Sequence, residues 1–196
     1  MFRLGDRRRV RGLSVSVFGD RAEAAAAHAR LDNALALIET HDPRRIRRLQ
    51  RDVARILVFG HETTRLAYFD PPIRWIIVTL RYAQASTTTA EHMAGTLVHE
   101  AAHARIANAG IRYAPGIRAR VEVVCAKQES SFALALPEGS ELATSSQADA
   151  SAWAEGGEGR WSDARFRDDT LRAARDNGMP EVLVRLLAWL TRKRAA

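Results

Sequence analysis

Cysteine is almost absent from this chain of 196 residues, and long apolar runs are missing altogether. With Cys125 as its one cysteine, the chain cannot form an internal disulfide. No run of 18 or more apolar residues occurs, so we expect no transmembrane span. The apolar run at residues 13–18 is interrupted by serines and is too short for the core of a signal peptide. These absences favour a cytoplasmic protein.

Lysine is scarce as well, because only Lys127 and Lys193 occur among the 30 basic residues. The net charge of +7 therefore comes from arginines, which are spread over every predicted helix together with many alanines. We interpret this pattern as a bias in composition, since charge alone is weak evidence for a nucleic-acid surface. Nucleic acid is accordingly not expected as a partner.

Three stretches in the first half of the chain predict strands. Residues 13–18 alternate apolar residues and serines, as a half-buried strand does. Residues 73–80 are rich in β-branched and aromatic residues, and residues 63–69 also fit a strand. The Asp-Pro-Pro sequence at residues 70–72 between them is a strong turn signal. We expect these strands to form a small sheet that precedes the central helix.

Two helices are expected between the first and second predicted strands. The first covers residues 21–40 and is rich in alanine. The second begins at Pro43, which suits the first position of a helix. Its apolar stripe is expected to consist of Ile46, Leu49, Val53, Ile56 and Leu57.

The second half of the chain is expected to be mostly helical. Residues 118–136 predict a helix, and residues 137–159, rich in glycine and serine, predict a loop with room for one short helix. Residues 163–176 and 181–194 predict two closing helices. We therefore divide the chain into a core at 1–136 and an appended segment at 137–196, which packs on that core through its helices.

The most informative stretch is the His-Glu-Ala-Ala-His motif at residues 99–103. Four residues apart on a helix, His99 and His103 share one face and can bind the same metal ion. Glu100 lies beside this pair, where it can act as the general base of a zinc hydrolase.

Signals for the ends of a helix surround the motif. Thr88 can cap the N-terminus, with Glu91 three residues later as in a capping box. Gly110 fits the left-handed position at which helices commonly end. We therefore expect the motif to lie within one helix, largely buried.

A catalytic zinc ion takes three protein ligands and keeps one position open. No histidine follows His103, so a third ligand after the motif must be a carboxylate, and Glu122 follows after eighteen intervening residues on the next predicted helix. His-Glu-x-x-His, eighteen residues and then Glu on a second helix resembles the gluzincin zinc peptidases, which include thermolysin and the one-zinc aminopeptidases. The resemblance covers residues 88–137. It implies that His99, His103 and Glu122 bind zinc and that Glu100 activates the zinc-bound water.

Three other residues compete for a place at this site. Glu129 lies seven residues after Glu122 on a similar helix face, about 10 Å away at about 1.5 Å per residue, so only one of the two can reach the ion. The resemblance favours Glu122 and leaves Glu129 as a surface group or a neighbour of the ligands. The same arithmetic excludes His92 as a ligand, because it shares the face of His99 but lies seven residues earlier on the helix. Cys125 is interpreted as a small buried apolar residue, although a thiol is also a good zinc ligand.

Together these features predict an α+β, zincin-like fold and a zinc metallopeptidase acting on a peptide or protein substrate. Two alternatives remain open: a zinc amidohydrolase for a non-peptide or formyl amide, and a basic binding protein with a structural zinc ion. The reaction also needs a donor for the oxyanion that forms on the scissile carbonyl. The candidates for this donor are Tyr82, Arg112, Tyr113 and Arg118.

Overall fold

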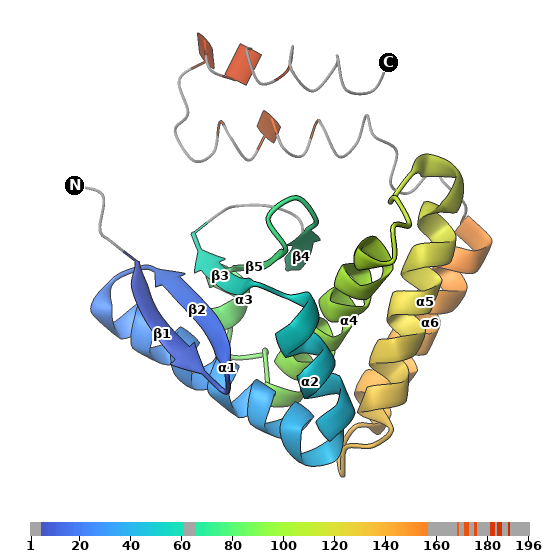
Figure 1. Ribbon diagram of the computed structural model, residues 1–196, viewed down its shortest axis with the longest axis horizontal. Coiled ribbons are helices and arrows are strands. Elements are labelled where there is room, and N and C mark those ends of the chain that lie inside the picture. The colour runs from blue at the N-terminus through green and yellow to red at the C-terminus, as the bar shows by residue number, and fades with distance from the viewer. Residues whose placement is uncertain are drawn as a thin grey trace.

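The computed structural model describes residues 5–60 and 66–156, and nine single positions between residues 168 and 188. Within the two continuous ranges the chain is α+β, with one five-stranded sheet and six helices (Figure 1). The predicted α+β class is thus confirmed. The helices predicted at 163–176 and 181–194 lie outside these continuous ranges.

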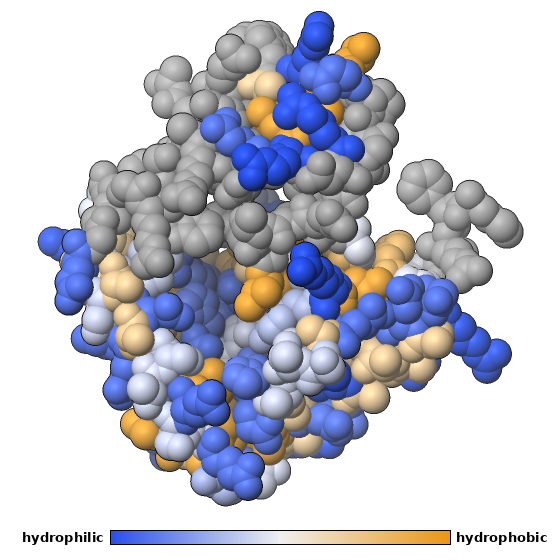
Figure 2. Space-filling model, turned by 180° about the vertical axis from the view of Figure 1, so that it is seen from behind, coloured by the Kyte–Doolittle hydropathy of each residue, from blue (hydrophilic) through white to orange (hydrophobic). Residues whose placement is uncertain are grey.

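None of the described helices is both long and apolar enough to cross a membrane. Figure 2 shows hydrophilic residues over much of the coloured part of one face, with apolar residues in small separate areas.

The sheet is mixed, with a parallel centre and antiparallel edges. β2 pairs in parallel with β3, β3 pairs in parallel with β5, and the edge strands β1 and β4 are antiparallel to their neighbours. The strands are β1 (Asp6–Val10), β2 (Leu13–Phe18), β3 (Arg55–Phe59), β4 (Ala67–Asp70) and β5 (Trp75–Thr79), in the order β1-β2-β3-β5-β4.

Two strands, β1 and β3, differ from the prediction. β1 is exposed over its three arginines, so it lacks the apolar alternation of a half-buried strand. It is joined to β2 by the two-residue turn Arg11-Gly12, whose φ values of 45° and 80° suit a type I′ hairpin. In β3, Ile56 and Leu57 were expected on a helix, but that helix ends at Asp52. Burial of Ile56 and Val58 in the sheet decides the structure of this segment.

The helices cover the sheet and build the rest of the core. α1 begins with a capping box in which Asp20 and Glu23 bond reciprocally to each other's backbone N–H, and α2 begins at Pro43 as predicted. One core cluster joins residues of the sheet to Leu35 of α1 and Leu97 of α4. The helices are α1 (Arg21–His41), α2 (Pro43–Asp52), α3 (Leu80–Gln84), α4 (Ala90–Asn108), α5 (Pro115–Ala133) and α6 (Ser140–Gly156).

The segment after Pro137 differs most from the prediction, because residues 140–156 form a full helix rather than a loop. The buried positions Leu142, Ala143, Ser146 and Ala150 recur at helical spacing and face α5, which lies between α4 and α6 (Figure 1). Small residues let these two helices approach closely. α6 therefore supports α5, the helix that carries the predicted third ligand.

The motif helix α4 has its predicted end and a start shifted by one residue. Its N-cap is Thr89, not Thr88: the Thr89 hydroxyl accepts a hydrogen bond from the backbone N–H of His92 at 3.2 Å, whereas Thr88 is buried. Glu91 consequently does not take the capping-box position. Gly110 follows the helix with a φ of 81°, as the left-handed C-terminal position requires.

Candidate metal centre

Three donor atoms from α4 and α5 converge between these helices. His99 Nε2 and His103 Nε2 lie 3.3 Å apart. Glu122 Oε2 lies 3.3 Å from His99 Nε2 and 3.5 Å from His103 Nε2. Ligands at about 2.0–2.1 Å from a tetrahedral zinc ion are about 3.4 Å apart, so this triangle has the dimensions of one face of a zinc site. The residues present therefore fit the metal that the sequence predicts.

The packing of α4 explains why both histidines point toward α5. Met93, Leu97 and Ala104 of α4 are fully buried in the core, which fixes the rotation of the helix. His99 and His103, four residues apart, then lie together on the face toward α5. A short connection at residues 109–114 leads directly to α5, which places Glu122 opposite them.

Glu129 contacts His99 from the other side of its ring. Its Oε2 lies 3.1 Å from His99 Nδ1, the ring nitrogen that faces away from Glu122. His99 is therefore held between two carboxylates, one at each nitrogen. Such a carboxylate fixes the tautomer and orientation of a metal-binding histidine. Glu129 is thus a neighbour of a candidate ligand, while Glu122 is the carboxylate at the two Nε2 atoms.

Gly95 allows this close approach of α5 and α6 to α4. A Cβ atom at Gly95 would lie 3.1 Å from Glu129 Oε1 and 3.0 Å from Leu142 Cδ2, both tighter than ordinary contacts. A larger residue here would push Glu129 away from His99. The glycine in this buried helix therefore serves the geometry of the site.

Cys125 is a further donor close to the two histidines. One donor atom from each of His99, His103 and Cys125 can be chosen so that all lie within 4.8 Å of one another, and these three residues could hold a metal ion. The Cys125 side chain is fully buried, and burial raises its pKa far above the usual range for a thiol. Glu122 Oε2 lies 3.3 and 3.5 Å from the two Nε2 atoms and is already anionic, so we favour Glu122 over Cys125 as the third ligand.

In the absence of metal, the carboxylates around His99 favour its protonated form. Burial lowers the pKa of His99, but hydrogen bonds with Glu122 and Glu129 outweigh it and raise the pKa to about 10. Burial raises the pKa of Glu122, but hydrogen bonds with His103 and His99 outweigh it and leave the pKa well below its usual range. Metal ligands must be deprotonated, so a metal ion that enters this site displaces a proton from His99.

Glu100 is beside the histidine pair and nearly buried. Only 7% of the surface of Glu100 is exposed, and its charge helps to raise the pKa of His99. Within the described part of the chain, its carboxylate has no hydrogen-bond partner. A buried carboxylate at a motif of this kind is available to a water molecule or a substrate.

Tyr113 and Arg118 are the oxyanion candidates that the structure brings to this centre. The Tyr113 hydroxyl donates to Glu122 Oε1, and its ring meets the ring of His103 edge-on with centroids 5.6 Å apart. The Arg118 guanidinium lies 5.0 Å from the centroid of the Tyr113 ring. Tyr82 is instead hydrogen-bonded to Thr96 at 2.8 Å.

His92 lies near the start of α4, away from the converging donors. Its Nδ1 is 3.1 Å from the Thr89 hydroxyl, so its ring takes part in the cap of the helix. A place in the cap gives this histidine a role without any metal.

Comparisons with known proteins identify no relative of this chain. No family model matches the chain, and neither curated proteins nor solved structures give a match. The candidate metal centre is therefore inferred from the geometry of its own residues.

Proposed function

We propose that this chain is a zinc-dependent metallopeptidase with a zincin-like fold, similar in its ligand set to the gluzincins. The observation that carries the proposal is the triangle of His99 Nε2, His103 Nε2 and Glu122 Oε2, with sides of 3.3–3.5 Å. Glu100 is near enough to His99 for its charge to help raise the pKa of that ring, and so supplies a carboxylate close to this triangle. Two imidazoles and one carboxylate with one open position are typical of catalytic zinc sites in peptidases.

In the proposed mechanism each residue has one task. Zinc, when bound by His99, His103 and Glu122, would polarise the scissile carbonyl and make a water molecule more acidic. Glu100 accepts the proton of the attacking water and then delivers it to the leaving amine, as one carboxylate can serve as base and then as acid.

Two neighbours position the ligands. Glu129 accepts a hydrogen bond from His99 Nδ1–H and so directs the lone pair of Nε2 toward the ion. Tyr113 donates to Glu122 Oε1, which leaves Oε2 to face the histidines. The substrate is a peptide or a protein in this proposal.

The direct test couples zinc content to hydrolysis. We expect the protein as purified to contain close to one zinc ion per chain and to cleave members of a mixed peptide library. Stepwise removal of zinc with a chelator should lower the rate in proportion to the zinc that remains, and added zinc should restore it. Elemental analysis and mass spectrometry of the products give the two quantities. Cleavage that stays constant while the zinc is removed would contradict the proposal.

A second function is favoured by one observation, the position of Cys125 near the histidines. If Cys125 joins His99, His103 and Glu122, the ion has four protein ligands, and a closed site of this kind is structural. The protein would then be a basic binding protein stabilised by zinc. In this arrangement the ion would have to displace the proton of a buried thiol whose pKa is raised in the absence of metal.

Replacing Cys125 with alanine separates the two functions. If Cys125 only fills space, the variant should keep one zinc ion and its hydrolysis rate within about threefold, with a loss of about 1 kcal/mol in unfolding free energy from the small cavity. The Val124→Ala variant, at a half-exposed neighbouring position, is the matched control. Loss of zinc in Cys125→Ala but not in Val124→Ala would support the structural zinc instead.

A further inference from the structure

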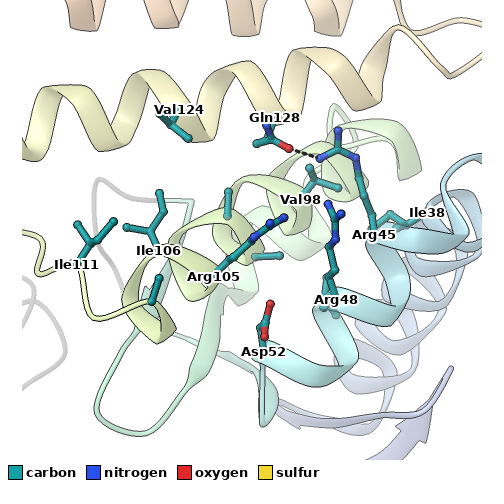
Figure 3. Close-up of a pocket in the computed structure, with 14 residues that line it drawn as sticks. Ile38, Arg45, Arg48, Asp52, Val98, Arg105, Ile106, Ile111, Val124 and Gln128 are labelled. Carbon is teal, nitrogen blue, oxygen red and sulfur yellow. Dashed lines mark hydrogen bonds between the residues drawn. The ribbon is translucent and has the colours of Figure 1, made fainter.

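A pocket separate from the metal centre lies between α2, α4 and α5. Its volume is about 330 Å³, near the lower end of about 300–1,000 Å³ for sites of small molecules. Apolar side chains from all three helices form its walls, among them Leu49 of α2. Val98, Ile106 and Val124 of α4 and α5 are labelled in Figure 3. The residues proposed for zinc chemistry do not line it, because they lie on other faces of α4 and α5.

Positive charge is concentrated at this pocket. Arg45 and Arg48 of α2 and Arg105 of α4 extend into the space between the helices (Figure 3). The one carboxylate among the lining residues, Asp52, already makes two hydrogen bonds with the guanidinium of Arg51, at 2.7 and 2.8 Å.

The three arginines differ in whether their charge is already matched. Arg45 pairs with Asp42 at 2.8 Å and donates to Gln128 at 2.8 Å. Arg48 and Arg105 are exposed and make no ion pair within the described part of the chain, although Arg105 is near enough to Asp52 for its charge to help lower the pKa of that carboxyl. The pocket thus combines an apolar interior with two guanidinium groups that are not held in ion pairs.

We propose that this pocket binds a small organic anion with an apolar body, of the chemical class of a medium-chain carboxylate. The carboxylate would lie between Arg48 and Arg105, because a guanidinium group binds a carboxylate through two parallel hydrogen bonds. The hydrocarbon part would cover the apolar walls, whose burial supplies most of the affinity. The site is distinct from the proposed zinc centre and does not require it.

Calorimetric titration of the zinc-loaded protein with three probes tests the required chemistry. Octanoate should bind more tightly than butyrate by a factor on the order of 10², since each buried methylene contributes about fourfold. Octylammonium, which has the same chain and the opposite charge, should not bind measurably. Equal affinity for octanoate and octylammonium, or no octanoate binding up to millimolar concentrations, would overturn the proposal.

Substitutions locate the site. Arg48→Ser and Arg105→Ser should each weaken octanoate binding by about tenfold, the lower end for a charge-assisted hydrogen bond. Arg47→Ser is the matched control, because Arg47 is exposed on the same helix as Arg48 and does not line the pocket. Melting temperature and zinc content should be the same in all three variants, which shows that the fold is intact.

A carboxylate could also bind at the zinc ion, so the design includes the metal centre. Octanoate binding that survives both pocket substitutions and is lost in His103→Ala would place the anion at the metal, and the pocket proposal would be wrong. Binding lost in the pocket variants but kept in His103→Ala supports the pocket, whatever the outcome for hydrolysis.

Discussion

Replacement of Glu100 with glutamine is expected to abolish hydrolysis while the zinc ion stays bound. Glutamine has nearly the same shape as glutamate but cannot accept the proton of the attacking water. Loss of general-base assistance costs about 10²–10⁴ in rate. The triangle of His99, His103 and Glu122 does not include Glu100, so the ligands of the metal remain. This one substitution should therefore lower the rate and leave the zinc content unchanged.

The measurement is the turnover number beside elemental analysis of the same samples. A fall confined to kcat, with KM within about threefold of the wild type, indicates loss of the chemical step rather than of substrate binding. Glu91→Gln is the matched control, because Glu91 is a partly exposed carboxylate on the same helix. Unchanged turnover in Glu100→Gln would remove Glu100 from the mechanism, and loss of zinc in this variant would make it a metal-binding residue.

Local patterns in the sequence predicted the elements whose signals lie within a few neighbouring residues. Pro43 marked the start of α2, Gly110 the end of α4, and the alternation at residues 13–18 the strand β2. The same patterns were wrong where partners distant in the sequence decide the structure. Ile56 continues the apolar stripe of α2 but is taken into β3 by pairing with both β2 and β5. Period and propensity do not contain that information.

The segment after Pro137 shows the same limit. Its glycines and serines suit a loop by composition, yet the small buried side chains of Ala143, Ser146 and Ala150 allow α6 to pack closely against α5. Ser130 of α5 donates a hydrogen bond to the backbone oxygen of Ala143 at 3.3 Å, a contact between helices that no local window of sequence contains.

At the metal centre, spacing alone placed His99 and His103 on one helix face, and the resemblance pointed to Glu122. The role of Glu129 was beyond spacing arguments. Two carboxylates about 10 Å apart along a helix cannot both reach one ion. An imidazole, however, presents nitrogens on opposite sides of its ring, so His99 meets Glu122 through Nε2 and Glu129 through Nδ1. The ring spans the gap that separates the two carboxylates.

This difference in position predicts different results when each carboxylate is removed. Glu122→Ala should lose zinc and hydrolysis together, because two histidines alone make an incomplete site and the ring nitrogens lose their anionic partner. Glu129→Ala should still bind one zinc ion, with affinity or activity lower by about 10–100-fold, as is usual when a group that orients a metal-binding histidine is removed. Glu129→Gln, whose amide oxygen can still accept from His99 Nδ1–H, should recover part of that loss.

Thermal unfolding with and without zinc provides a measurement that is independent of any substrate. A ligand that binds the folded protein raises its stability by an amount that grows with concentration relative to the dissociation constant, about 2.7 kcal/mol at a hundredfold excess over that constant. Added zinc should therefore raise the melting temperature of the wild type and, at higher concentration, of Glu129→Ala, but not of Glu122→Ala. If Glu122→Ala keeps its zinc and its zinc-dependent stabilisation while Glu129→Ala loses both, the third ligand is Glu129, and the proposed triangle of donors is wrong.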